Sequence, residues 1–386
     1  FINDGNYNII RNSTMRDAHG WAGIHMSNGS HHNKLLNNVF DNIGTNNDGV
    51  EDHGDMLVIK CANFNLVEGN TFSRGGHNLF EVMGLSNVLR DNTFDNQWDN
   101  FGAGSRIGDL NTNEKYNCPP AQERGNTLFE GNVLRNAAAT ADDPENTALK
   151  VQGNRNIVRR NIFINNISNV FQSALREPEH VETRSNRIYN NTLYDNGSFW
   201  TARSYGRKTF SAEDNEFKNN IIAEMRSQRA IHVDWLSRAD AISNSPLNEN
   251  RLVSNAFHGV SQVKFRVIGI GTESLHWFES NYSDLVSGNI LSDPQFLVSK
   301  PSERSDFELS PSSPMIDAAG MKPIQADLKR FEGISDKQQL AKVLGSQVRA
   351  DVDPLNATDF ATENLFGVFV TQALKGGEVV PYILQG

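Results

Sequence analysis

The sequence predicts an all-β fold, a right-handed parallel β-helix in which short strands stack coil upon coil. Three observations predict it: one phrase recurs along the chain, alternating strand-like segments precede several of its copies, and asparagine is concentrated where it recurs. Of the 47 asparagines, 43 lie in residues 1–255 and 4 in residues 256–386. Because asparagine is unfavourable inside helices and strands, a folded segment this rich in it must place it at recurring turns.

The recurring phrase starts with asparagine and ends on an apolar residue seven positions later, with a second asparagine or small polar residue between them. Its copies end at Met15, Phe40, Phe72, Phe94, Leu134, Phe163, Leu193, Ile222 and Phe257. The closest end points are 22 residues apart, which leaves room for short strands but not for a strand–helix–strand crossover. Alternating segments such as 56–61, 79–84 and 148–153 supply a further strand upstream of the phrase. We therefore expect a solenoid whose asparagines tolerate left-handed turn positions and stack into ladders along the axis.

The repeat and its end segment define one β-helix domain over residues 1–320, with a loop insertion at about residues 97–124. Loops on a rigid scaffold often carry binding residues, so we expect Trp98 and Arg106 of this insertion to contact a substrate. Residues 321–386 contain few asparagines, and we predict that they form a C-terminal cap or docking segment with a short helix at 336–344. No cap precedes the first coil, so we expect either a protein partner over that end or a chain that is a fragment or mature product.

Composition excludes several classes of function. The net charge of −10 gives no electrostatic footprint for nucleic acid, and no apolar run is long enough for a membrane-spanning helix. Two cysteines are too few for a disulfide scaffold or a multi-cysteine metal module. Cys61 and Cys118 could pair, although two buried thiols is the commoner outcome.

The asparagine phrase resembles the parallel β-helix repeat of secreted bacterial and archaeal carbohydrate-active proteins. The segments 293–296 and 305–320 resemble the part of the chain that closes many such β-helices. This resemblance implies a secreted, periplasmic or cell-surface protein that acts on or binds an extracellular polysaccharide.

Chemically active residues gather in the first coils. Six of the ten histidines lie within the first 77 residues, beside the acidic loop 48–55. Aligning the strands on their glycine or cysteine ends places His25, Val58, Glu81 and Lys150 in one outward column, and Lys60, Met83 and Gln152 in the next. We therefore expect carboxylates, imidazoles, a lysine and an arginine on one patch, with His25 and Glu81 contacting the substrate.

A patch of carboxylates, imidazoles, a lysine and an arginine suits β-elimination of a uronic acid polymer. That reaction needs a base for the proton next to a carboxylate and a cation that neutralises the carboxylate. Lys60 or His77 suits the base, and Arg74 lies close to them in sequence. Asp48, Glu51, His53 and Asp55 are the predicted metal ligands, with Ca²⁺ favoured by the oxygen-rich acids.

The stretch from Asp55 to Cys61 resembles the motif of polysaccharide lyase family 6, in which an acidic calcium ligand precedes the catalytic lysine by five positions and a serine follows. The resemblance implies that Asp55 binds calcium and Lys60 is the base. The chain departs from the motif at three places: Cys61 replaces the serine, His53 replaces a second acidic ligand, and Glu81 stands about where the family has an arginine.

Other interpretations remain open at this stage. His19, His25, His53 and His77 could instead bind Zn²⁺ or Cu²⁺. Lys60 could be an ordinary solvated charge at a strand end. The protein could be a non-catalytic glycan-binding or assembly subunit, or a glycoside hydrolase with paired carboxylates.

Overall fold

The fold is taken from a computed structural model of the chain. It describes residues 2–18, 20–44, 54–97, 105–108, 118, 124–137, 147–167, 169–175, 181–204, 210–227, 229–234, 247, 249–259, 263–267 and 270–315. The predicted cap at 321–386, with its helix at 336–344, therefore lies outside the described residues.

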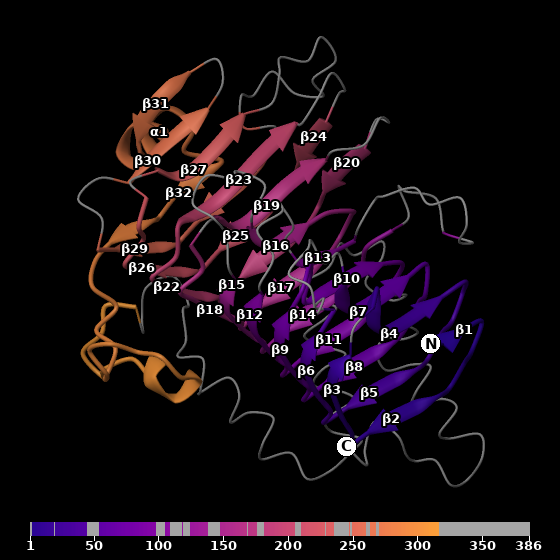
Figure 1. The fold of residues 1–386 in the computed structure, drawn as a ribbon. Helices are drawn as coiled ribbons and strands as arrows, with labels where there is room; N and C mark the ends of the chain where they lie inside the picture. Colours follow the sequence, from indigo (N-terminus) through magenta and orange to yellow (C-terminus); the bar gives the residue numbers. More distant parts are fainter. Residues whose placement is uncertain are drawn as a thin grey trace, which may run out of the picture.

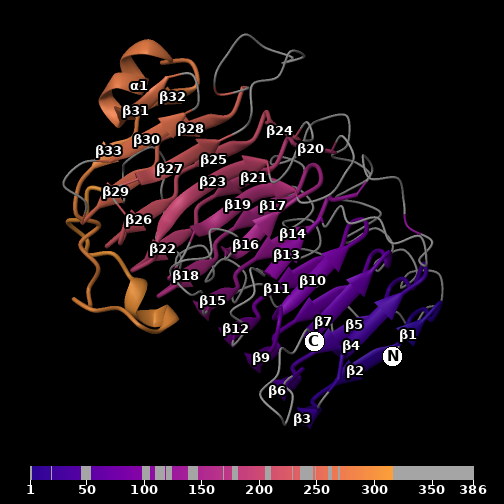
Figure 2. The same cartoon turned by 45° about the horizontal axis from the view of Figure 1, so that its top comes forward.

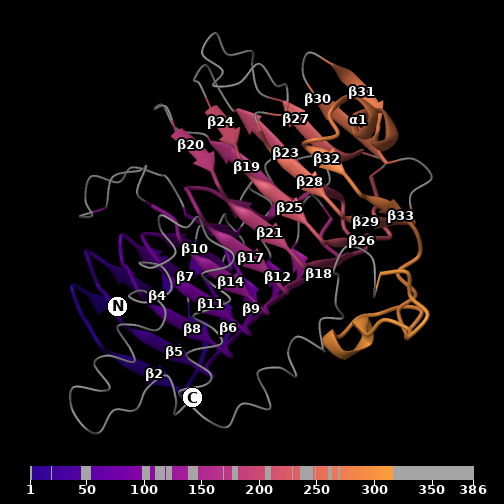
Figure 3. The ribbon, with the colours of Figure 1, turned by 180° about the vertical axis from the view of Figure 1, so that it is seen from behind.

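The described chain is a solenoid of three parallel sheets, each of which takes one strand from every coil (Figure 1). The first sheet contains β1 (Ile2–Asn3), β4 (Ala22–Ser27), β7 (Asp55–Lys60), β10 (Phe80–Met83), β13 (Ser105–Ile107), β16 (Thr147–Val151), β19 (Asn169–Leu175), β23 (Ser198–Ser204), β27 (Arg229–Asp234), β30 (Lys264–Val267) and β31 (Gly271–Ser274). The second contains β2 (Ile9–Arg11), β5 (Lys34–Leu36), β8 (Leu66–Glu68), β11 (Val88–Arg90), β14 (Leu128–Glu130), β17 (Ile157–Arg159), β21 (Arg187–Tyr189), β25 (Glu216–Lys218), β28 (Arg251–Val253) and β32 (Val286–Ser287), side by side in Figure 3.

The third sheet contains β3 (Thr14–Ala18), β6 (Val39–Ile43), β9 (Thr71–Gly75), β12 (Thr93–Gln97), β15 (Val133–Ala137), β18 (Ile162–Ile164), β22 (Thr192–Tyr194), β26 (Ile221–Ala223), β29 (Ala256–His258) and β33 (Ile290–Leu291). A small separate pair joins β20 (Val181–Arg184) to β24 (Phe210–Glu213). The prediction of a right-handed parallel β-helix is confirmed. No helix among the described residues is long and apolar enough to cross a membrane.

The apolar end points of the phrase fill the interior of the solenoid. They are the inward residues of the third sheet, and the rings of Phe40, Phe72 and Phe94 stack nearly parallel, with centroids 4.8 and 5.0 Å apart. This spacing matches the distance between neighbouring strands, so identical residues in successive coils pack as a continuous column.

The two asparagine positions of the phrase form two ladders, as the sequence predicted. One ladder precedes the second-sheet strands and the other precedes the third-sheet strands. In each rung of the second ladder the side-chain amide donates to the next coil's asparagine Oδ1, as from Asn161 Nδ2 to Asn191 Oδ1 at 2.9 Å. The second ladder runs through Asn38, Asn70, Asn92, Asn132, Asn161, Asn191, Asn220 and Asn255.

The left-handed backbone position lies one residue before each ladder asparagine. In the second ladder it is held by Asn37, Gly69, Asp91, Gly131, Arg160, Asn190, Asn219 and Ser254. Asparagine therefore serves both predicted roles, but at neighbouring positions: the ladder residue hydrogen-bonds and the preceding residue turns the chain.

The C-terminal end of the solenoid is covered by β31, which pairs antiparallel with β30, and by α1 (Leu275–Asn281). Ser274 caps α1, and Phe278 packs against Phe265 of the last first-sheet coil, with ring centroids 5.1 Å apart. The sequence did not predict this helix.

Residues 292–315, here called the return segment, lie on the outer face of the third sheet (Figure 2). The segment contains the short 3-10 helix η2 (Arg304–Phe307). Phe307 packs with Ile162 and Ile164, and Met315 packs with Ile221 and other outward residues of this sheet. The sequence predicted that this part of the chain closes the β-helix, and the structure shows it covering a side of the solenoid.

Candidate functional site

The predicted outward column on the first sheet is present. Parallel pairing places His25 beside Val58 and Val58 beside Glu81. Arg106 follows Glu81, and Lys150 follows Arg106. The sequence placed Arg106 in the loop insertion, whereas the structure places it on β13, because part of residues 97–124 forms another first-sheet strand.

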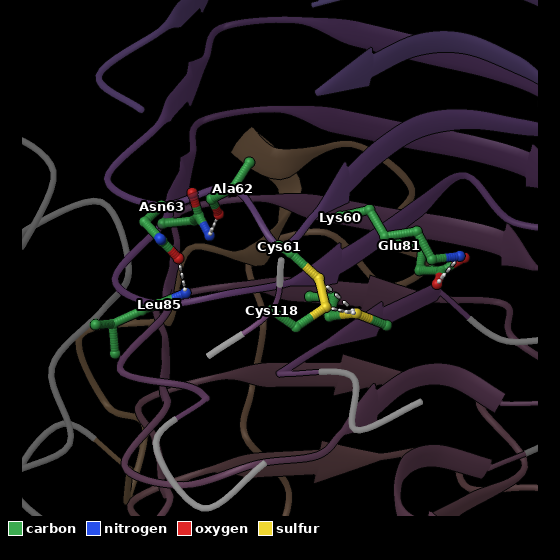
Figure 4. The surroundings of a disulfide bond; sticks show 9 residues. Lys60, Cys61, Ala62, Asn63, Glu81, Leu85 and Cys118 are labelled. Carbon is green, nitrogen blue, oxygen red and sulfur yellow. Dashed lines mark hydrogen bonds and ion pairs between the residues drawn. A yellow bond between two sulfur atoms is a disulfide. The ribbon is translucent and has the colours of Figure 1, made fainter. Parts of the chain in front are cut away.

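Lys60 and Glu81 form an ion pair across neighbouring coils (Figure 4). The Lys60 Nζ atom lies 3.4 Å from Glu81 Oε1, and the side chains are 9% and 8% exposed. They occupy adjacent outward columns on β7 and β10, so they are diagonal neighbours, a separation that long side chains can bridge.

Trp21 is the solvent-exposed residue that contacts this ion pair. Lys60 Nζ lies over the Trp21 ring, 5.4 Å from its centroid, in the range of a cation–π contact. The indole also meets the His25 ring edge-on at 4.8 Å, and Trp21 is 47% exposed. We call Trp21, His25, Lys60 and Glu81 the Trp21–Glu81 cluster.

His25 is the sheltered member of the cluster. Burial, followed by the nearby positive charge of Lys60, lowers the pKa of His25 to about 4. Its imidazole is therefore neutral at physiological pH, and it adds no positive charge beside Lys60.

His77 pairs with Asp55 at the opposite end of the same two strands. The His77 Nδ1 atom lies 3.1 Å from Asp55 Oδ1, and the Asn78 side chain is 2.8 Å from the same nitrogen. His77 precedes Glu81 by four residues, a separation of roughly 13 Å along an extended chain. The predicted patch is therefore split in two, and His77 and Lys60 are too far apart to act on one sugar atom.

Arg74 is not brought to either pair. It lies on β9 of the third sheet, where its guanidinium binds both carboxylate oxygens of Asp41 at 2.8 and 2.6 Å. Ser73 donates a third hydrogen bond to that carboxylate. The expectation that Arg74 lies with the catalytic residues is not supported, because an acid one coil earlier holds it on a different face.

The structure describes only part of the predicted metal site. Asp48, Glu51, His53, His19 and the predicted sugar contact Trp98 lie outside the described residues. Of the predicted calcium ligands the structure describes Asp55, which is 2% exposed and hydrogen-bonded to His77. The described ranges contain no group of three histidine, cysteine or acidic residues that could hold a metal ion. Because three of the four predicted ligands lie outside the described residues, calcium binding stays a prediction.

A disulfide between Cys61 and Cys118 borders the cluster (Figure 4). Cys61 directly follows Lys60, and both sulfurs lie beside the Met83 Sδ atom, at 3.4 and 3.5 Å. The expectation of two buried thiols was therefore wrong. Met83 is the strand partner of Lys60, so the disulfide packs against the residue two positions after Glu81 on β10.

Sequence reasoning missed Trp21. The residue stands four positions before His25, at the start of the first coil's alternating segment, and could have been found by extending the strand alignment backwards. Comparisons with protein-family models, curated proteins and solved structures find no match to this chain. The interpretation of the cluster therefore depends on its chemistry alone.

Proposed function

We propose that the protein binds an acidic polysaccharide on the outer face of the first sheet and cleaves it by β-elimination. The observation that carries this proposal is the ammonium of Lys60, held between the Glu81 carboxylate and the half-exposed indole of Trp21. A sugar ring stacks its apolar face on an indole, and a uronate carboxylate pairs with a lysine ammonium. The two contacts together select an acidic sugar over a neutral one.

In the cleavage step, the Lys60 ammonium first releases its proton to solvent, and the resulting amine takes the proton next to the substrate carboxylate. Arg106, which follows Glu81 in the outward column, is the cation that neutralises that carboxylate. The electron pair left on carbon forms a double bond as the glycosidic carbon–oxygen bond on the neighbouring carbon breaks, and the leaving oxygen takes a proton from water. Glu81 accepts a hydrogen bond from the lysine ammonium that forms, which stabilises the charge developing in the transition state. A polysaccharide substrate also fits a secreted, periplasmic or cell-surface location.

Calorimetric titration with uronate oligosaccharides and with neutral oligosaccharides of equal length tests the binding step. We expect binding of the acidic ligand only, roughly tenfold weaker in Trp21→Ala and in Lys60→Ala. Lys218→Ala removes an exposed lysine of the second sheet and is the matched control. Equal affinity for acidic and neutral ligands would contradict the proposed recognition.

A second function is favoured by the exposed side chains of the first coil. Tyr7, Ile9 and Trp21 are 51%, 36% and 47% exposed, and β1, β2 and β3 are each outermost in the described sheets. Exposed aromatic and aliphatic side chains gathered on one coil suit contact with a protein partner. In that case the protein is an assembly subunit, and light scattering of native material would show a complex that Ile9→Asp disrupts.

A further inference from the structure

Three sulfur atoms from three segments of the chain meet beside the end of β7. Cys61 directly follows β7, Met83 is the last residue of β10, and Cys118 comes from the insertion between the coils. The Met83 Sδ atom lies 3.4 Å from Cys61 Sγ and 3.5 Å from Cys118 Sγ. The two cysteines, joined in Figure 4, are both of the cysteines in the chain.

The solenoid fixes two of these three residues relative to each other. The Cys61 backbone amide donates to the Met83 carbonyl at 2.7 Å, and both side chains are completely buried. Cys61 has a φ of 55°, in the left-handed region, whereas the same corner of the adjacent coils is held by Asn28 and Gly84, which adopt a positive φ more readily. The turn therefore does not favour cysteine here, and what the residue supplies is its sulfur.

The chemistry of this sulfur set points to one class of metal ion. Two cysteine thiolates and a methionine thioether are soft ligands, which select Cu(I). Zn²⁺ takes four ligands from cysteine, histidine and carboxylates, and the described residues contain no group of three such side chains that could hold a metal. Because the third sulfur belongs to methionine, a count of cysteines alone does not reveal the site.

The sulfur positions suit an ion with three ligands. A metal–sulfur bond of about 2.3 Å places the sulfurs of a trigonal site roughly 4 Å apart. The contacts of Met83 with the two cysteines, at 3.4 and 3.5 Å, are close to this value. The cysteine sulfurs are about 2 Å apart in any disulfide, and rotation of the reduced side chains separates them. Cys118 is half-buried and gives access from solvent.

We propose that Cys61, Cys118 and Met83 bind one Cu(I) ion when the disulfide is reduced. Two external thiols break the sulfur–sulfur bond, deliver two electrons and two protons to the cysteines, and leave as their own disulfide. Cu(I) then displaces the two thiol protons and bonds both thiolates and the Met83 thioether, with no change in its oxidation state. The insertion is thereby tied to the coils either by a covalent bond or by a metal ion. This site does not depend on the proposed glycan chemistry, which uses the side chains of Lys60 and Glu81.

Competition with the Cu(I) chelator ferrozine tests the proposal. The full chain is reduced with tris(2-carboxyethyl)phosphine, desalted without oxygen and titrated into the Cu(I)–ferrozine complex, whose visible absorbance falls as copper leaves it. We expect the reduced wild type to take one Cu(I) per chain and the untreated disulfide form to take none. Cys118→Ser should bind Cu(I) roughly a hundredfold more weakly. Failure of the reduced wild type to withdraw copper would overturn the proposal.

A matched pair of methionine variants separates this site from copper binding by any pair of free thiols. Leucine replaces methionine with little change in volume, so Met83→Leu should keep the disulfide and the stability of the oxidised protein. Its reduced form should bind Cu(I) roughly tenfold more weakly than the wild type. Met56→Leu changes a buried methionine of the interior and should leave the affinity unchanged. Equal affinity in Met83→Leu and the wild type, the result that a reduced and unfolded chain would also give, would contradict the proposed site.

Because these titrations contain no glycan, their outcome is separate from that of the proposed function.

Discussion

Asn161 is a central rung of the second asparagine ladder, and replacing it with alanine tests what holds the coils together. Its Oδ1 accepts hydrogen bonds from the backbone amide and the side-chain amide of Asn132, at 2.8 and 3.1 Å. Its Nδ2 donates to the Phe129 carbonyl and to Asn191 Oδ1, both at 2.9 Å. The side chain is completely buried.

The loss of stability in Asn161→Ala can be estimated from the hydrogen-bonding groups that lose their partner. The Asn132 backbone amide loses its acceptor, and the Asn132 side-chain amide keeps only its bond to the Leu89 carbonyl. A buried polar group without a partner costs about 1–3 kcal/mol. With two donors and two acceptors affected, we expect the free energy of unfolding to fall by about 3–5 kcal/mol, a large part of a typical stability.

Urea unfolding followed by circular dichroism measures this loss, and hydrogen exchange locates it. The amide of Asn132 should lose protection together with the neighbouring coils, since each coil is held by its neighbours. Asn281→Ala, at an exposed site at the end of α1, is the control and should change stability by less than about 0.5 kcal/mol. If Asn161→Ala is as stable as this control, the ladder does not stabilise the solenoid as argued.

Three further predictions address the ladder, the histidines and the disulfide. Thr127 replaces asparagine in the first ladder, and its hydroxyl is buried without a hydrogen-bond partner among the described residues. Thr127→Asn should restore the rung and raise the urea concentration at the unfolding midpoint. Burial, followed by the charge of His31, lowers the pKa of His32 to about 4. Because the unfolded state binds more protons between pH 6.5 and 4, the free energy of unfolding should decrease by at most about 3 kcal/mol as the pH is lowered through this range. Paired urea titrations should show a smaller decrease in His32→Phe. Cys118→Ser opens a covalent link with a sequence separation of 57 residues, should lower the free energy of unfolding by about 2–4 kcal/mol, and should make unfolding insensitive to reductant.

The coil architecture could be predicted from the sequence because every coil repeats the same two physical requirements. An apolar residue must fill the interior at each third-sheet strand, and an amide must satisfy the backbone at each corner. The copies ending at Phe72 and Phe94 meet both, with Asn70 and Asn92 as consecutive ladder rungs. The outward column from His25 to Glu81 could also be aligned, since register follows from the same repeat.

The features that the sequence did not predict depend on contacts outside the repeat. The pairing of Arg74 with Asp41 could not be predicted, because it requires knowing which outward acid on the third sheet lies one coil away. The bond between Cys61 and Cys118 depends on the path of the insertion between the coils, for which the phrase has no counterpart. Trp21 was missed because its role comes from its contact with Lys60 and not from a motif.

The separation of His77 from Lys60 is the most useful correction to the predicted site. Both residues border the same two strands, but one contact lies where β7 begins and the other where it ends. A strand carries its residues about 3.3 Å apart, so residues near in sequence can serve different places on a solenoid. This geometry leaves the Trp21–Glu81 cluster as the site where an acidic sugar would meet both an aromatic ring and a lysine.

The most direct test of the proposed function is the near-ultraviolet absorbance of unsaturated sugar ends, followed while the protein is incubated with alginate, pectate and glycosaminoglycans. The wild type should generate this absorbance from at least one of these polymers. Lys60→Ala should abolish it without loss of fold, and Lys218→Ala should retain it. No absorbance from any uronate polymer, or full activity in Lys60→Ala, would contradict the assignment of Lys60 as the base of an acidic-polysaccharide lyase.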